Sequence, residues 1–409
     1  MIPLELSVIE PLGRLYARPW ADEVAGVKID SRRIEEGDLF VAVGGGVDFV
    51  QHALARGAAA ALVPEKPDRA LAVIGGTVRD RSDARVVGIT GSTGKTTTKD
   101  ILAAICAPHA RVVASEGNYN NELGVPLTLC RLEHDTEICI SEMGMRGLGQ
   151  IAWLASFARP DVAIITNVGP VHLELVGTVE NVARAKGELI AALPPGGIAV
   201  VPDEPLLEPY LSRTDIEIRR FGAIREPGVY EIGPRKVLIN TNYDARHQLQ
   251  NTLAALIAAD ALGIRLEDRA DLHVEFSPLR EQEVELPNEV VVINDCYNAN
   301  PVSMRAALAN LAERAGSRRR VAVLGEMAEL GADAPAYHRE VAALVHELGV
   351  TVIAVGALAR DYVPNGGVWV ATADEAAEEL RALLQPGDVV LVKGSRAVGL
   401  EVVAEKLSA

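Results

Sequence analysis

The chain has 409 residues, and its 40 basic and 56 acidic side chains give a formal net charge of −16. Because this length exceeds that of a usual single core, we expect two or three domains. Apolar residues make up 49% and charged residues 23% of the chain, a composition that is typical of globular proteins and excludes a disordered or fibrous one. The acidic excess argues against a general affinity for nucleic acid or for an anionic membrane surface.

The cysteines and the N-terminal segment indicate the compartment. The four cysteines form no CxxC pair, which is typical of a reducing environment. They are Cys106, Cys130, Cys139 and Cys296. The first residues, MIPLELSVIEPLGR, carry acids where a signal peptide needs bases, and no apolar run approaches the ~18 residues of a membrane span. We therefore expect a cytoplasmic protein without a membrane span.

The first 83 residues predict a small α/β unit. Short β-like segments at residues 26–29 and 39–43 precede a helix-like stretch at 48–57 and an apolar run at 58–63. We expect residues 1–83 to form the first domain.

From residue 86 onward, apolar runs alternate with helical segments. The runs lie at residues 86–90, 111–113, 137–140, 162–166 and 198–201. Such alternation predicts βαβ units and a mainly parallel sheet. An apolar helix at 249–262 closes this region, and residues 276–287 are interpreted as a connector. The second domain is therefore expected at 84–277.

A second alternating series follows the connector. Strands are expected at residues 290–293, 321–324, 352–355 and 389–392, with helices at 303–314, 336–348 and 374–384. This pattern predicts a smaller, doubly wound α/β domain over residues 278–409. The fold class is therefore α/β with three domains.

A glycine-rich loop is the strongest motif. From position 88 the chain reads GITGSTGKTTT, after an expected strand and at the start of an expected helix. In that setting backbone N–H groups cradle phosphates, while Lys95 would contact the β- and γ-phosphates and Thr96 would bind Mg²⁺. The strict pattern has a further glycine six residues before the lysine, where this chain has isoleucine, so Gly91 and Gly94 supply the permissive backbone. The alternative is a glycine-rich turn with an exposed lysine.

Polar side chains follow two of the expected strands. Glu142 comes just after the strand at 138–140, and Asn167 and His172 lie just beyond the strand at 162–166. Open α/β sheets bind ligands at the carboxyl ends of their strands, so Glu142 is a candidate Mg²⁺ ligand. His172 is either part of the same site or a surface loop residue.

Lys186 falls on the apolar stripe of an expected helix, together with Val182 and Leu189. Desolvation lowers a lysine pKa, and a neutral amine can bond to carbon dioxide, which gives a carbamate that binds metal. The alternative is an amine that reaches solvent along its aliphatic stem.

Three further polar residues have open interpretations. Asp295 follows the strand at 290–293 and could hold a ribose hydroxyl or a cation, while Asn300 beside it could simply cap a helix. Asn251 lies within an otherwise apolar helix and is either a buried hydrogen-bonding residue or an adenine reader.

Taken together, these segments resemble the Mur ligase family over nearly the whole chain. The motifs that carry the resemblance are DSR (30–32), GDLF (37–40), TGSTGKTT (90–97), NYNNELG (118–124), EMGM (142–145), TNVG (166–169), HLE (172–174), AKGE (185–188), DCYNANP (295–301), LGEMAELG (324–331) and KGSR (393–396). The segments YNANP and EMAELG are most similar to the members that add D-alanyl-D-alanine.

The resemblance implies a cap for the UDP end of the substrate, a central P-loop ATPase domain and a C-terminal Rossmann-like domain. It implies ATP and Mg²⁺ as cofactors, with Lys95, Lys186 and His172 as catalytic residues. The implied nucleotide contacts are Thr90, Gly91, Ser92, Thr93, Gly94, Lys95, Thr96, Thr97, Asn251, Arg280 and Asp295. The implied Mg²⁺ ligands are Thr96 and Glu142 for one ion, and His172 and carbamylated Lys186 for a second.

The resemblance also implies the reaction. D-alanyl-D-alanine would be joined to a UDP-N-acetylmuramoyl-tripeptide through an acyl phosphate, in peptidoglycan precursor synthesis, and we expect a monomer. Ser31 and Arg32 match the motif that faces the UDP-sugar, and Asn120 and Asn121 match the stretch beside the peptide.

The chain departs from the family pattern in two places. The cap has a short GGGVDF segment where the family carries a longer loop, and ARHQ stands at 245–248 in place of GRHN. Two other functions remain open: a Mur-type amide ligase with a different acceptor, and a P-loop regulator that binds nucleotide without ligating anything.

Overall fold

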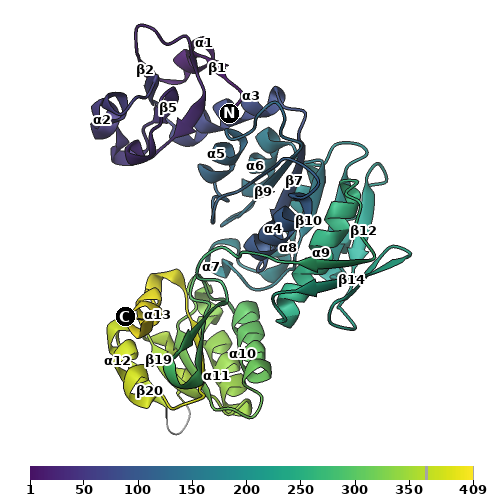
Figure 1. Ribbon diagram of the computed structural model, residues 1–409, viewed down its shortest axis with the longest axis vertical. Coiled ribbons are helices and arrows are strands. Elements are labelled where there is room, and N and C mark those ends of the chain that lie inside the picture. Colours follow the sequence, from purple (N-terminus) through teal and green to yellow (C-terminus); the bar gives the residue numbers. More distant parts are fainter. Residues whose placement is uncertain (364–366, 409) are drawn as a thin grey trace.

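The computed structural model describes residues 1–363 and 367–408. Three α/β units follow one another along the chain, from the purple N-terminal unit through the teal and green central unit to the yellow-green C-terminal unit (Figure 1). The predicted α/β class is confirmed. In the described part of the chain, no helix is both long and apolar enough to cross a membrane.

The N-terminal unit is built on a four-stranded sheet in the order β2-β6-β5-β4. Its elements are β1 (Leu4–Glu5), α1 (Leu6–Ile9), β2 (Arg14–Ala17), β3 (Glu23–Val24), β4 (Gly26–Lys28), β5 (Asp38–Val41), α2 (Val50–Ala55) and β6 (Ala60–Val63). The helix expected at 48–57 is shorter than predicted, because Gly44–Phe49 forms a 3₁₀ segment before α2 begins.

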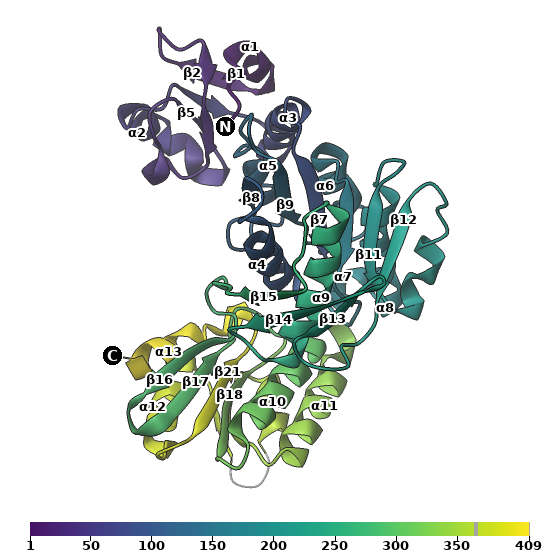
Figure 2. The ribbon, with the colours of Figure 1, turned by 45° about the vertical axis from the view of Figure 1, so that its right-hand side comes forward.

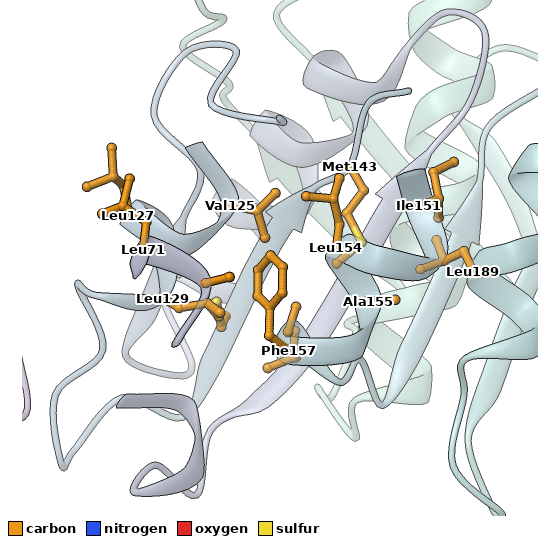
Figure 3. Packing of buried hydrophobic residues seen from close by; sticks show 14 of the residues in the cluster. Leu71, Val125, Leu127, Leu129, Met143, Ile151, Leu154, Ala155, Phe157 and Leu189 are labelled. Carbon is orange, nitrogen blue, oxygen red and sulfur yellow. The ribbon is translucent and has the colours of Figure 1, made fainter. Parts of the chain in front are cut away.

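Helix α3 (Pro67–Asp80) follows β6, and the sequence analysis did not predict it. It packs against α5 and α6 of the central unit, where Leu71, Val125 and Phe157 come together (Figure 3). One continuous apolar cluster therefore joins the N-terminal residues to the central sheet.

The central sheet has six strands in the order β12-β11-β10-β7-β9-β8, and all of its pairings are parallel. Its strands are β7 (Arg85–Thr90), β8 (Val112–Ala114), β9 (Ile138–Glu142), β10 (Val162–Ile165), β11 (Ile198–Pro202) and β12 (Glu217–Phe221). The helices are α4 (Lys95–Cys106), α5 (Gly124–Leu129), α6 (Gln150–Ala158), α7 (Leu173–Val176), α8 (Val179–Ala191) and α9 (Arg246–Ala261).

Helices cover both faces of this sheet, so its central strands are mainly apolar, whereas the edge strand β12 (EIRRF) carries three charged residues. Successive residues of β7 show the alternation: Val86 packs in the cluster with α3, α6 and α8, and Val87 packs in the cluster with α4 and α9. This two-sided burial is why apolar runs predicted five of the six strands, while β12 at the edge of the sheet was not predicted.

A small sheet of β13 (Val229–Ile232), β14 (Arg235–Thr241) and β15 (Arg269–Leu272) was not predicted. Along β14 buried residues alternate with exposed ones, and β15 alternates between exposed and half-buried residues, so no continuous apolar run marks this sheet.

The C-terminal sheet has the order β16-β17-β21-β18-β19-β20, with its first strands side by side in Figure 2. Its strands are β16 (Gln282–Leu286), β17 (Val290–Asn294), β18 (Arg320–Gly325), β19 (Thr351–Val355), β20 (Val368–Val370) and β21 (Val389–Lys393). The helices are α10 (Pro301–Ala315), α11 (Ala334–Glu347), α12 (Ala373–Leu383) and α13 (Glu401–Ser408).

The interpretation of residues 276–287 as a connector was wrong in its second half. Residues 282–286 form β16, which pairs antiparallel with β17 at the edge of the sheet. The segment QEVEL has only two apolar residues, because an edge strand buries little of its surface.

Candidate active site

A cavity of about 1260 Å³ lies at the carboxyl ends of the central strands, and residues of all three units line it. Lys95, Glu142 and Lys186 line it from the central unit, and Asp295 and Lys393 from the C-terminal unit. The N-terminal residues contribute Val43, Gly44, Pro67 and Asp68. Parallel sheets bind ligands at this edge, so the cavity is the candidate active site.

The glycine-rich loop connects β7 to α4 in the way the sequence predicts. Gly94 has φ +75°, which favours glycine, and a Cβ there would lie 2.6 Å from Asn251 Oδ1. Asn167 holds the loop, because its Oδ1 accepts from the Thr93 amide at 2.9 Å and its Nδ2 donates to Thr93 Oγ1 at 2.7 Å. Residues 91–97 line the cavity at the N-terminus of α4, which is the position that binds phosphate in such loops.

Lys95 is the first residue of α4, and its Nζ donates to the Gly91 carbonyl at 2.8 Å. Burial lowers the pKa of Lys95, while the nearby Glu142 carboxylate opposes this effect and the Arg280 guanidinium adds to it. The amine thus lies in the loop with a second cation close to it, an arrangement that suits a ligand carrying several negative charges.

Glu142 ends β9 and is fully buried. Its Oε2 accepts from Thr96 Oγ1 at 2.7 Å, and its Oε1 accepts from Asn120 Nδ2 at 2.7 Å. A buried carboxylate beside a hydroxyl is a donor set that fits Mg²⁺, which takes one or two carboxylates together with phosphate oxygens. No group of three or more His, Cys, Asp or Glu suited to a metal occurs at residues 1–363 or 367–408.

Lys186 lies in α8 with 1% of its surface exposed, so the alternative in which its amine reaches solvent does not hold. Its amine lines the cavity and has no hydrogen bond or ion pair with the described residues. Burial lowers the pKa of Lys186 well below its usual range, and the charge of Lys95 adds to this effect.

His172 precedes α7 and lines the same cavity. Its Nδ1 lies 2.5 Å from Oε2 of Glu329, a residue of the C-terminal unit. Burial lowers the pKa of His172, and the Glu329 carboxylate partly opposes this shift. The structure brings His172 and Glu142 to one cavity, as expected from the strand ends, and Lys186 of α8 lines the same cavity.

The C-terminal side of the cavity carries the expected residues Arg280 and Asp295. The Arg280 guanidinium lies 4.3 Å from the centre of the Tyr297 ring, and the Asp295 carboxylate forms an ion pair with Lys393. Asn251, on α9 of the central unit, also lines the cavity and lies against the glycine-rich loop.

The four expected substrate residues separate into two pairs. Asn120 and Asn121 line the cavity, and the Asn121 side chain also accepts from the amide of Gly124 at 2.9 Å. Ser31 and Arg32 lie in the N-terminal unit and do not line this cavity. Ser31 Oγ bonds His52 Nδ1 at 3.0 Å, and Arg32 is paired with Asp30.

Sequence reasoning assigned no role to Lys393 and Glu329. Lys393 ends the apolar strand β21, so the rule applied to Glu142 could have found it. Glu329 lies in a loop, and no local signal places it beside His172.

The fold and the cavity define a P-loop nucleotide-binding protein whose site is completed by a Rossmann-like C-terminal unit. Residues 89–259 match the Mur ligase middle domain, and residues 280–396 match the Mur ligase, glutamate ligase domain. Together with the relatives below, these matches show that the chain belongs to the Mur ligase family.

Curated relatives match the chain over nearly its full length. The chain is 31% identical to the UDP-N-acetylmuramoyl-tripeptide–D-alanyl-D-alanine ligase of Bacillus subtilis, over 98% of this chain and 97% of the relative. It is 32% identical to the protein of that name from Escherichia coli, over 93% of each chain.

Solved structures agree with this assignment. MurF from Acinetobacter baumannii superposes with a TM-score of 0.85 at 27% identity, over 100% of this chain and 99% of that one. MurF ligase from Thermotoga maritima in complex with ADP gives a TM-score of 0.80 at 30% identity, over 93% of this chain and 96% of that one. The three-domain architecture expected from the resemblance is confirmed.

Proposed function

We propose that this protein joins D-alanyl-D-alanine to a UDP-N-acetylmuramoyl-tripeptide with the consumption of ATP, in peptidoglycan precursor synthesis. The observation that carries the proposal is the cavity in which the P-loop Lys95, the buried Glu142 and the buried Lys186 face Asp295 and Lys393 of the C-terminal unit. The relatives named for this reaction support it over nearly the full chain.

The chemistry has two steps. A carboxylate oxygen of the tripeptide attacks the γ-phosphorus of ATP, so that an acyl phosphate forms and ADP leaves. The amine of D-alanyl-D-alanine then attacks the acyl carbon, a C–N bond forms, and the C–O bond to phosphate breaks. An α-amine with a pKa of ~8 is only about one-tenth unprotonated at pH 7, so a base that takes its proton accelerates the second step. We propose His172 as a candidate for that base, as the alternative to a role as metal ligand, because its one free ring nitrogen cannot hold an ion and take a proton at the same time.

The phosphate-binding roles fall to the glycine-rich loop and to the residues beside it. Lys95 neutralises charge on the β- and γ-phosphates, and residues 90–97 with Asn251, Arg280 and Asp295 hold the nucleotide. Thr96 and Glu142 would hold one Mg²⁺, and their buried oxygens fit it. Bound Mg²⁺ supplies positive charge that stabilises the transferring phosphoryl group.

Lys186 and His172 are proposed as ligands of a second ion. A neutral Lys186 amine adds to carbon dioxide, forms an N–C bond and releases a proton, which places carbamate oxygens in the cavity. The lowered pKa of Lys186, caused by burial, favours the neutral amine that this addition needs. The absence of a partner for the amine among the described residues supports the same assignment.

We propose three functional domains, at 1–83, 84–277 and 278–409. Ser31 and Arg32 would contact the UDP-sugar from the first domain, and Asn120 and Asn121 would contact the peptide. We propose that the protein acts in the cytoplasm, because its substrates are ATP and a nucleotide-linked precursor, and that it acts as a monomer.

One assay tests the function. Phosphate release and amide product are measured with ATP, Mg²⁺ and a panel of UDP-N-acetylmuramoyl-peptides, with and without D-alanyl-D-alanine. We expect product only with a tripeptide and D-alanyl-D-alanine together, and a panel of third residues identifies the accepted peptide. Product with a different acceptor would identify another Mur-type ligase, and nucleotide binding without product would identify a regulator.

A further inference from the structure

One loop residue of the C-terminal unit, Glu329, contacts the central unit in three ways. Its Oε2 lies 2.5 Å from His172 Nδ1, and its Oε1 lies 4.0 Å from Arg146 Nε. Its carbonyl accepts from the Glu174 amide at 3.3 Å. All three partners belong to the central unit, and α7, which begins next to His172, lies at the edge of that unit near the C-terminal unit (Figure 1).

The backbone on both sides of this contact is unusual. His172 has φ +52° and Glu329 has φ +62°, although neither is glycine. Such conformations cost of order 1–3 kcal/mol each and persist only where the surroundings impose them. Gly331, at φ +64°, lies so close to Glu174 that a Cβ would be 3.3 Å from its Cα.

The segment that carries Glu329 is itself fixed. The Met327 amide donates to Nε2 of the buried His338 at 3.0 Å, and the Ala328 amide donates to Ser395 Oγ at 2.8 Å. Because the C-terminal core holds this segment, the Glu329 carboxylate is presented to His172 at a defined position.

We infer that Glu329 is a positioning residue for the ligase reaction: it fixes the His172 ring from the other side of the domain interface. A carboxylate that accepts from one ring nitrogen sets the tautomer and leaves the other nitrogen available to the cavity. His172 is then held in its working orientation only when the C-terminal unit is in place. The inference rests on the proposed function, and it adds a residue of another domain to the site.

Three variants of Glu329 test the inference. Glu329→Ala removes the acceptor, and Glu329→Asp retracts it by one methylene, so both should lower kcat about tenfold. Glu329→Gln keeps an acceptor oxygen and should lose less activity. KM for ATP and for both other substrates should change less than about twofold, since Glu329 is not placed on a substrate.

A second measurement reports the tautomer of the His172 imidazole directly. In protein labelled with ¹⁵N-histidine, the parent should show His172 in one tautomer, protonated at Nδ1, and Glu329→Ala should move its nitrogen shifts towards a mixture of tautomers. The matched control is Glu340→Ala, which removes a carboxylate that is paired with Arg305 within the C-terminal unit. It should leave both kcat and the His172 shifts unchanged.

The outcomes are distinct. Unchanged kcat in Glu329→Ala, an equal loss in Glu340→Ala, or a lower kcat with unchanged His172 shifts would each overturn the inference. If the parent forms no amide product, the proposed function fails, and the nitrogen shifts alone then decide whether Glu329 orients His172.

Discussion

Lys186 is a buried amine without a partner at residues 1–363 or 367–408, and this has a cost for stability. Desolvation disfavours the charged form, so the free energy of unfolding is lower than it would be with an apolar side chain at this place. Groups retained in spite of such a cost are common in active sites.

We therefore predict opposite effects of Lys186→Met on stability and activity. The thermal midpoint should rise by a few degrees, because an apolar side chain of similar length replaces a desolvated amine. Ligase activity should fall by at least about 100-fold, since a charged ligand position is lost. Calorimetry and the phosphate assay measure the two effects.

The smaller variant Lys186→Ala separates a carbamate from a plain amine. It should be equally inactive but should recover part of its activity as acetate is added, because a small carboxylate can replace the carbamate oxygens. Lys186→Arg keeps a positive charge and should stay inactive. Full activity in Lys186→Ala would refute the carbamate.

At the residue scale, cavity residues were predicted best from the sequence where a polar residue comes soon after an apolar strand. Glu142 and His172 were found in this way, because parallel strands end at one edge. Glu329 could not be found, since its contact with His172 depends on how two domains meet. Ser31 and Arg32 rested on resemblance alone, and the structure keeps them away from the central cavity.

At the scale of elements, α3 shows why one helix escaped prediction. Its sequence contains two adjacent glycines, Gly75 and Gly76, which disfavour a helix by about 1 kcal/mol each. Tertiary packing explains the first of them: a Cβ at Gly75 would lie 2.9 Å from the Pro126 backbone of α5. At Gly76 the nearest atom, Phe157 Cβ, would be 3.4 Å away.

These glycines form a matched pair for a test. Gly75→Ala should lower the free energy of unfolding by about 1–3 kcal/mol, because α3 must move away from α5. Gly76→Ala should lie within about 1 kcal/mol of the parent, since the gain in helix propensity offsets slight crowding. Urea unfolding measures both, and equal stabilities would contradict this packing of α3 on α5.

The stability of the junction between α11 and the loop before it should depend on pH. His338 is fully buried, its Nδ1 donates to the Ala334 carbonyl at 2.7 Å, and its Nε2 must be unprotonated to accept from Met327. Burial lowers the pKa of His338. The unfolded chain therefore binds a proton near pH 6.5 that the folded chain does not bind.

This difference in proton binding decides whether the free energy of unfolding rises or falls with pH. Stability from neutral His338 is fully present above about pH 6.5 and is lost as the pH falls from there towards the folded pKa, by up to about 1.4 kcal/mol per pH unit. His338→Gln should remove that slope, as measured by hydrogen exchange of α11 amides against the parent at each pH. The exposed His134→Gln is the control, and an unchanged slope in His338→Gln would contradict the prediction.

At the scale of the whole molecule, the sequence predicted the succession of units but not how they meet. Alternating apolar runs marked the two large sheets because helices bury both of their faces. The contacts between units are made by polar loop residues and by close approaches such as Gly169 to Val302, where a Cβ would lie 2.6 Å from Val302 Cγ2. Such contacts have no period along the chain that a sequence pattern could reveal.

Because residues of the central and C-terminal units line one cavity, we predict that a bound nucleotide links the two units. With Mg²⁺ and a non-hydrolysable ATP analogue at about 100 times its Kd, amides of residues 91–99 and of residues 294–303 should both be protected from exchange, by up to about 100-fold. Both segments contribute lining residues to one cavity, so one ligand should stabilise both.

Asp295→Ala should make this protection unequal. The glycine-rich loop keeps its contacts with the phosphates, so protection of residues 91–99 should remain once the analogue is saturating. Lys393 loses its ion-pair partner and the C-terminal wall loses a nucleotide contact, so protection of residues 294–303 should fall. Asp268→Ala, whose carboxylate is exposed and lies outside the cavity, should behave as the parent does. Protection confined to residues 91–99 in the parent would mean that nucleotide binds to the central unit alone, and the link between the two units would then have to come from the peptide substrate.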